Sequence, residues 1–122
     1  MTSLVTRDEE ALVAYATSGG DGQAMFQVQG LSNIIDHGLG IQEAIERPRF
    51  VWGRPGPEAG VTVQIEARAG GGVVDELRRR GHAVRVLGDF AHETGHAHGI
   101  TRRGCTLTGG ADPRGDGAAL GF

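Results

Sequence analysis

The sequence of 122 residues contains no lysine, one cysteine and four prolines. All twelve basic residues are arginines, and they are gathered only at Arg78–Arg80, so the basic footprint of a nucleic-acid-binding protein is missing. A single cysteine, Cys105, excludes a disulfide framework within the chain. The 22 glycines follow no triplet period and proline is scarce, which excludes collagen-like and Pro/Gly-rich low-complexity chains.

Long apolar runs are missing too. No stretch is long enough to cross a bilayer, and residues 1–7 have neither the charged start nor the apolar core of a signal peptide. We therefore expect no membrane partner and a cytoplasmic location for this chain, with export of a longer parent protein as the alternative. The length predicts a single domain over residues 1–122 that can bury a core, and the many glycines indicate tight turns.

Apolar residues spaced by about 3.6 positions predict a helix from Asp21 to His37. Asp21 or Ser18 can cap its start, and Gly38 stands where a left-handed residue ends a helix. The residues that define the apolar face of this helix are Met25, Phe26, Val28, Leu31, Ile34 and Ile35.

Short apolar or alternating runs predict strands, and glycine or proline clusters predict the turns between them. The expected strands are 4–6, 11–17, 49–52, 61–67, 82–87, 95–102 and 105–108, with shorter helices over 41–47 and 73–80 and a loop over 53–60. This pattern predicts an α+β domain. Because three helices cannot cover a sheet of five or six strands, one sheet face should expose apolar side chains.

The first candidate site is the pair Gly19-Gly20, between a predicted strand and a predicted helix. Two backbone N–H groups near a helix N-terminus can bind an anion or stabilise an oxyanion as it forms. Such a turn, taken alone, is more often structural. The nearby Asp21 disfavours an anion unless its side chain caps the helix and points away.

The second candidate is the segment His92–His96, which matches the H-E-x-x-H motif of zinc proteases. That motif requires both histidines on one face of a helix. Gly95 lies inside the match and a strand is predicted to follow it. We therefore expect a loop here and no metal ion.

Two further patterns are expected to be structural. Ser18 is not in a G-x-S-x-G elbow, and Cys105, in a predicted strand, is expected to be a small buried side chain and not a nucleophile. The arginine and aspartate side chains of segments 47–54 and 112–117 are expected to lock loops through charge-assisted hydrogen bonds.

Five segments taken in order have a combined pattern that is specific. They are 18–23 (Ser-Gly-Gly-Asp-Gly-Gln) leading into a helix with Gln27 or Gln29, then 34–39, 42–50, 80–84 and 109–119. Over essentially the whole chain this pattern resembles the C-terminal part of the small subunit of gamma-glutamyltransferases (glutathione hydrolases). The Gly-Gly-Asp-Gly-Gln form points to the glutathione-hydrolase-like and cephalosporin-acylase-like branch of that family.

The resemblance implies a fragment of the four-layer αββα sandwich of N-terminal-nucleophile hydrolases, with no cofactor. In that family a proenzyme cuts itself and frees a threonine, whose own α-amino group is the base for attack on a γ-glutamyl amide. The family's glycine pair donates backbone N–H groups to the oxyanion, and it corresponds to Gly19 and Gly20 here.

The resemblance also implies what this chain does not supply. The family's nucleophilic threonine, and the residues that hold the glutamyl α-amino and α-carboxylate groups, precede the matched segment. Thr2 stands only seventeen residues before Gly19, much closer than the family's nucleophile, so we do not expect it to substitute.

We expect the chain to supply the oxyanion-hole segment and to need either a large-subunit-like chain or a second copy of itself. The substrate class of the parent, whether glutathione, another γ-glutamyl compound or a β-lactam side chain, stays open. The alternative is a non-catalytic binding or assembly domain.

Overall fold

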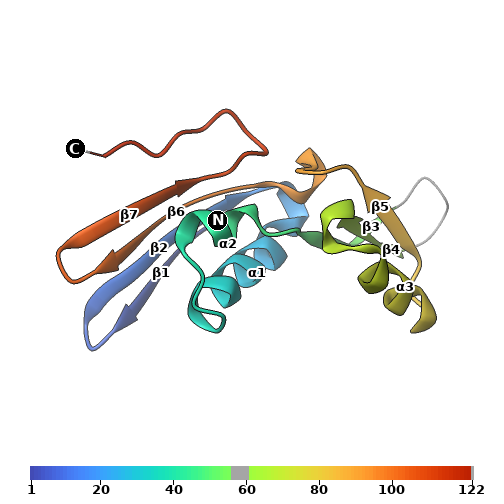
Figure 1. Cartoon of the computed structure of the whole chain (residues 1–122), viewed down its shortest axis with the longest axis horizontal. Helices are drawn as coiled ribbons and strands as arrows, with labels where there is room; N and C mark the ends of the chain where they lie inside the picture. The colour runs from blue at the N-terminus through green and yellow to red at the C-terminus, as the bar shows by residue number, and fades with distance from the viewer. Residues whose placement is uncertain (56–60, 122) are drawn as a thin grey trace.

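The structure is a computed structural model that describes residues 1–55 and 61–121, and its helices and strands confirm the predicted α+β class (Figure 1). Its strands are β1 (Thr2–Arg7), β2 (Glu10–Ser18), β3 (Phe50–Pro55), β4 (Val61–Glu66), β5 (Val84–Leu87), β6 (His96–Arg103) and β7 (Thr106–Ala111). Its helices are α1 (Gln23–Ile35), α2 (Ile41–Glu46) and α3 (Gly71–Arg79), with 3-10 turns η1 (Gly20–Gly22), η2 (Ala67–Ala69) and η3 (His92–Thr94). Of the loop expected over 53–60, residues 53–55 belong to β3 and 56–60 lie outside the described residues.

The described strands form two sheets, so the expectation of one sheet of five or six strands is wrong. One sheet has four antiparallel strands in the order β1-β2-β6-β7, and the other has three in the order β3-β4-β5. In the smaller sheet β3 and β4 are antiparallel, whereas β4 and β5 are parallel and joined through α3. The two sheets lie one after the other along the long axis of the molecule (Figure 1).

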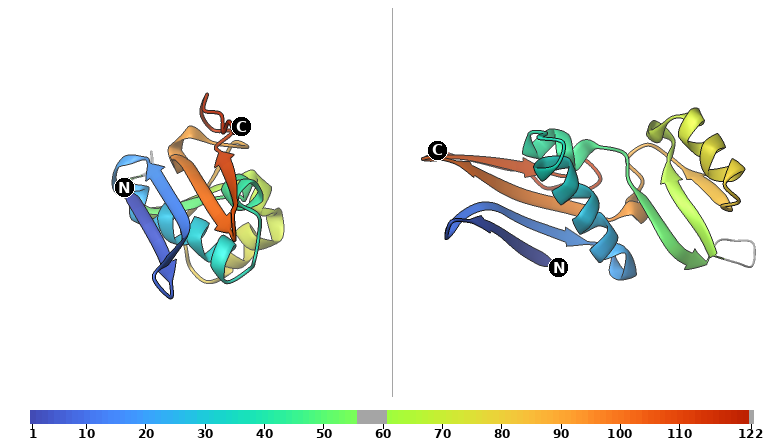
Figure 2. Two further views of the ribbon diagram at one scale, coloured as in Figure 1. Left: turned by 90° about the vertical axis from the view of Figure 1, so that its left-hand side faces the viewer. Right: turned by 90° about the horizontal axis from the view of Figure 1, so that it is seen from below.

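The helices α1 and α2 pack on one face of the four-stranded sheet (Figure 2). The core there consists of Val13, Tyr15, Ile41, Ile45 and Ala97. On the opposite face of the sheet Leu4, Ala14 and Ile100 form one row across the ladder, and Leu4 is 63% exposed. The predicted exposed apolar area is therefore confirmed on this face, which the described helices leave uncovered and along which the C-terminal residues 117–121 lie.

The boundaries and caps of α1 differ from the prediction. The helix begins at Gln23 after η1, and no side chain caps either element, so the expected caps from Asp21 or Ser18 are wrong. Val28 is 67% exposed because it lies on the side of α1 that faces away from the sheet. Gly38 has φ +67°, which confirms the left-handed residue after the helix.

Cys105 is not in a strand. It is exposed in the turn between β6 and β7, because Gly104, with φ +59°, reverses the chain one residue earlier. No helix among the described residues is long and apolar enough to cross a membrane.

The contact between α1 and β2 depends on the absence of a side chain at Gly30. A Cβ at this position would overlap the hydroxyl group of Tyr15. That hydroxyl is buried and has no hydrogen-bond partner in the described part of the chain. Tight packing therefore sets the distance of α1 from the sheet.

We predict that Gly30→Ala lowers the free energy of unfolding by about 1–3 kcal/mol, because an overfilled core must shift. Tyr15→Phe removes the nearest of the atoms that the new methyl group meets but leaves the ring carbons Cζ and Cε1 in overlap with it, so the double variant should recover only part of the loss. Gly72→Ala, in α3 with open space around it, is the control and should not destabilise the protein. Urea unfolding measures all four proteins, and equal losses with and without Tyr15→Phe would contradict this account.

Candidate functional site

The chain between β2 and α1 turns at Gly19 and Gly20, both of which have positive φ angles of +139° and +60°. This backbone conformation favours glycine at both positions. Gly20 is exposed, and its N–H forms no hydrogen bond within the described ranges 1–55 and 61–121. The turn leads through η1 into α1, so it lies at the positive end of a helix.

The Gly19 backbone packs against the backbone of a second turn. A Cβ at Gly19 would come within 2.9 Å of the Gly95 Cα and 2.8 Å of the Phe26 ring. A Cβ at Gly95, where φ is +69°, would overlap the carbonyl oxygen of Ser18. Neither turn can therefore move without displacing the other.

Hydrogen bonds from buried side chains join the end of β2 to the first turns of α1. The hydroxyl of Thr17 donates to Gln27 Oε1 at 2.8 Å, and Gln27 Nε2 donates to the carbonyl of Tyr15 at 3.0 Å. Thr17 and Gln27 are both buried. They hold the two arms of the glycine turn at a constant separation.

A buried cluster of charges lies behind the Gly95 turn. Arg49 contacts Asp112 at 2.6 Å, and Arg114 contacts Glu66 at 2.6 Å and Asp112 at 3.0 Å. The side chains of Glu66, Asp112 and Arg114 are completely buried, and that of Arg49 is 3% exposed. We call these four residues the ion cluster. They come from β4, from the connection between α2 and β3, and from the segment after β7.

The ion cluster binds the Gly95 turn directly. Arg49 donates to the carbonyl of Gly95 at 3.1 Å, and Asp112 accepts from the N–H of Ala97 at 2.7 Å. Glu66 accepts from the Thr94 hydroxyl at 3.0 Å. The cluster thus fixes η3 and the start of β6, and through Gly95 it fixes the position of Gly19.

The two buried carboxylates stay ionised because of their arginine partners. Burial alone would raise the pKa of Glu66, but the hydrogen bonds and charge of Arg114 outweigh it and hold that pKa below its usual value. The pKa of Asp112 is also lowered, since the charge of Arg49 and the hydrogen bonds from Arg114 outweigh the effect of burial. Among the described arginines of segments 47–54 and 112–117, Arg49 and Arg114 lock loops, as expected, whereas the exposed Arg47 pairs with Glu43 on α2.

Glu66 is the member of the cluster that the sequence analysis missed. The strict alternation of apolar and polar residues over 61–67 is typical of a half-buried strand and put Gln64 and Glu66 on its polar face, yet both are buried together with Val63 and Ile65. Both faces of β4 are covered, so its alternation does not mark a solvent side. The only sequence feature that could have pointed to Glu66 is that arginines expected to lock loops need carboxylate partners.

The H-E-x-x-H segment is divided between η3 and β6, not placed on one helix, as expected from Gly95. His92 and His96 are nevertheless neighbours, with Nδ1 and Nε2 3.0 Å apart. Within the described residues no group of three potential ligands surrounds a possible metal position. Ser18 is the ladder partner of His96, but no hydrogen bond joins their side chains in this part of the structure.

Comparisons with known proteins place the chain among one group of related proteins. The family model described as Gamma-glutamyltranspeptidase matches residues 1–122. Among curated proteins, the chain is 38% identical over 123 residues to a glutathione hydrolase-like proenzyme (YwrD) of Bacillus subtilis, covering 100% of this chain and 23% of that protein. It is 38% identical over 112 residues to the oxamate amidohydrolase proenzyme of Klebsiella pneumoniae, covering 91% of this chain and 21% of that protein.

The solved structures that resemble this chain belong to the same group of proteins. The gamma-glutamyltranspeptidase of Pseudomonas nitroreducens, complexed with L-DON, is 28% identical with a TM-score of 0.82, covering 100% of this chain and 61% of that one. The cephalosporin acylase of Bacillus halodurans is 30% identical with a TM-score of 0.81, covering 98% of this chain and 22% of that one. The chain therefore spans less than a quarter of the length of the curated relatives it matches.

We predict that Glu66→Gln lowers the free energy of unfolding at pH 7 by about 3–5 kcal/mol, because it removes one of the two carboxylates that pair with the buried Arg114 and leaves Asp112 to balance both Arg49 and Arg114. The matched control is Glu43→Gln on α2, whose exposed pair with Arg47 should be worth less than about 0.5 kcal/mol. Urea unfolding measures both.

The pH dependence of the unfolding free energy gives a second test, which needs only the wild-type chain. Carboxylates with a lowered folded pKa stabilise the fold fully above their unfolded pKa, about 4, and this contribution is lost as pH falls through the folded pKa. Unfolding free energy should therefore fall steadily below about pH 5. A flat profile between pH 5 and 2, or a Glu43→Gln variant as unstable as Glu66→Gln, would contradict the role of the ion cluster.

Proposed function

The chain belongs to the gamma-glutamyltranspeptidase family, and on that premise we propose that it supplies the oxyanion-hole segment of a γ-glutamyl amide hydrolase or transferase. Members of this family are N-terminal-nucleophile amidohydrolases, and the solved relatives confirm the expected fold class, a fragment of the four-layer αββα sandwich. The donors we assign are the backbone N–H groups of Gly19 and Gly20.

The exposed N–H of Gly20 is the observation that carries this proposal. It lies at the N-terminal end of α1, where the helix dipole favours negative charge. The turn is held from behind by Phe26 and Gly95, so the N–H is aimed before substrate arrives. Preorganised donors of this kind stabilise a developing oxyanion without having to reorganise.

In the proposed reaction the hydroxyl oxygen of a threonine attacks the amide carbonyl carbon, and the threonine's α-amino group takes the hydroxyl proton. The carbonyl electrons move to its oxygen, where the donors of the glycine turn stabilise the charge. Collapse breaks the C–N bond, the amine leaves with the proton, and an ester-linked acyl-enzyme remains. Water or an amino acceptor then releases the acyl group. The threonine belongs to another segment of the parent protein.

The substrate class rests on what the relatives are named for. One is glutathione hydrolase-like, one an oxamate amidohydrolase and one a cephalosporin acylase. We place a γ-glutamyl amide first because the family model is that of the gamma-glutamyltranspeptidases. Oxamate and a cephalosporin side-chain amide are the substrates to compare with it.

A second function, non-catalytic assembly, is favoured by the uncovered face of the four-stranded sheet. Leu4, Ile100 and Leu107 are each about half to two-thirds exposed there. Contiguous apolar surface of this kind usually marks an interface. We propose that a large-subunit-like chain covers it in the complete enzyme, and a second copy of this chain is the alternative occupant.

We predict that the 122-residue chain alone does not hydrolyse a chromogenic γ-glutamyl anilide, because oxyanion donors without a nucleophile have no intermediate to stabilise. A partner bearing the threonine should restore turnover. Turnover by the pure chain that Thr2→Ala abolishes would overturn the proposal. If no partner restores activity while the chain forms a stable oligomer by light scattering, the assembly function is the better account.

In the complete or reconstituted enzyme, we predict that Gly20→Ala lowers kcat by roughly a hundred- to a thousand-fold, the usual effect of losing one oxyanion donor. The melting temperature should correspond to a loss of no more than about 1–2 kcal/mol. Gly81→Ala is the control, since Gly81 also has a left-handed φ, +88°, but precedes β5 in the other sheet. It should cost similar stability and leave kcat unchanged. An active but unstable Gly20→Ala enzyme would mean that the turn is only structural.

A further inference from the structure

A cavity of about 580 Å³ lies between the helix-covered face of the four-stranded sheet and the corner where α1 leads into α2. It is at the end of the sheet that carries both hairpin turns, visible together at the left of Figure 1. Its volume is within the usual range of small-molecule sites, roughly 300–1,000 Å³. No part of the proposed amide chemistry uses it.

The walls of the cavity are mainly apolar. Val5, Val13, Thr101 and Thr108 are successive partners across all four strands, so they form one row under the cavity. The side facing this row comes from the end of α1 and the following loop. The apolar residues on that side are Ile34, Ile35, Leu39 and Ile41.

The charged residues that line the cavity all have the same sign. They are Arg7, Arg102 and Arg103, and none of the described lining residues is acidic. Arg102 donates from Nε to the carbonyl of Gly104 at 2.9 Å, which orients its guanidinium at the hairpin tip. Neither Arg7 nor Arg103 forms an ion pair within residues 1–55 and 61–121.

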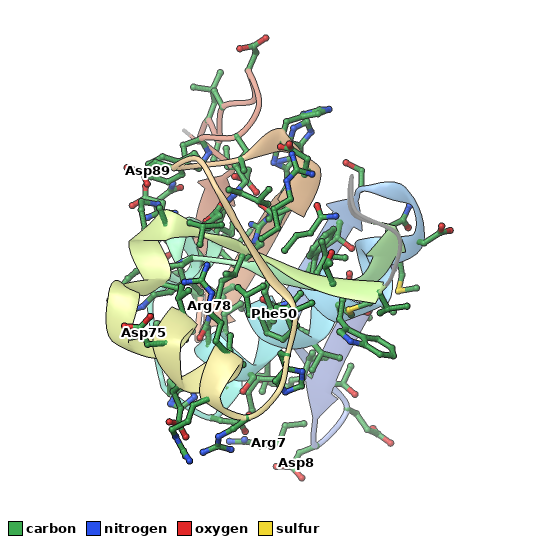
Figure 3. The ribbon with its side chains drawn as sticks, turned by 90° about the vertical axis from the view of Figure 1, so that its right-hand side faces the viewer. Arg7, Asp8, Phe50, Asp75, Arg78 and Asp89 are labelled. Atoms are coloured by element: carbon green, nitrogen blue, oxygen red, sulfur yellow. The ribbon has the colours of Figure 1, made fainter. Side chains whose placement is uncertain are left out.

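Arg103 lies two residues after Thr101 on β6, so by strand alternation it shares the face that lines the cavity. Arg7 ends β1 next to the hairpin turn that contains Asp8, and the two are labelled at the lower edge of Figure 3. The exposed Arg7 and Arg103 therefore lie at the mouth of the cavity, and buried apolar side chains such as Val13 and Ile41 lie deeper inside it. The acidic residues of the same hairpin, Asp8, Glu9 and Glu10, are outside the lining, although Glu10 is the ladder partner of Arg7.

We propose that this cavity binds a small amphipathic anion, an alkyl chain or ring that carries one free carboxylate. The apolar part would lie between the sheet and α1, and the carboxylate would pair with Arg103 and Arg7, since planar guanidinium groups bind carboxylates in a bidentate manner. The site is separate from the glycine turn. Residues 14–18 of β2 lie between Val13 of the cavity lining and Gly19, a distance of roughly 20 Å.

Octanoate, 1-octanol and octylamine, titrated into the 122-residue chain, test the proposal because they share an alkyl chain and differ in charge. Octanoate should bind at least tenfold more tightly than either of the others. Amide chemical-shift changes should map to Gly38, Thr101 and Thr108. Arg103→Gln should weaken octanoate binding by about five- to tenfold, whereas Arg85→Gln on β5 should leave it unchanged.

The outcomes separate the possibilities. Equal affinity for octanoate and octanol, or equal effects of Arg103→Gln and Arg85→Gln, would overturn the anion site and leave a merely apolar groove. Shift changes confined to the uncovered sheet face, around Ile100, would also overturn it. Far-UV circular dichroism of each variant confirms folding, and neither substitution touches the glycine turn, so failure here would not bear on the proposed amide chemistry.

Discussion

The structure depends on a buried cluster of two carboxylates and two guanidinium groups that joins its two sheets. Each sheet has its own small apolar core, and α1 also contacts β3 of the smaller sheet. The buried charged connection comes from Arg114, which bonds Glu66 of the three-stranded sheet and Asp112 at the end of the four-stranded one. Charges this deeply buried are costly unless every partner is present, so the cluster specifies one arrangement of the sheets.

The ion cluster fixes the geometry of the candidate site. Arg49 holds the carbonyl of Gly95, and the Gly95 backbone abuts Gly19 so closely that neither position accepts a Cβ. The glycine turn is therefore fixed from its inner side by charge-assisted hydrogen bonds and left open on its outer side. An oxyanion hole needs this combination, because its donors must be aimed in advance and must still reach the substrate. A site built from backbone N–H groups has no side chain of its own to orient it, so neighbouring turns must do so.

The sequence allowed much of this to be predicted, and the failures have physical reasons. The strands, the three helices and the left-handed Gly38 follow from periodicity and glycine chemistry. The division into two sheets does not, since pairing between distant strands leaves no local pattern. Glu66 was placed on a polar face because alternation cannot tell a solvated face from one covered by another part of the chain. Cys105 was placed in a strand because the two-residue turn, at Gly104 and Cys105, lies one residue later than the pattern suggested. The proposed role of Gly19 and Gly20 rests on the family resemblance and not on the turn, which alone is ambiguous.

The central claim, that the ion cluster positions the glycine turn, is tested most directly by backbone amide exchange in Arg49→Lys. Lysine keeps the charge but loses the forked geometry that bonds Asp112 and Gly95 together. Under conditions where the variant is folded, the account predicts faster exchange and shifted resonances at Gly19, Gly20 and Gly95, with α3 unchanged. Unaltered glycine amides, or equal changes in α3 and in the turn, would contradict it.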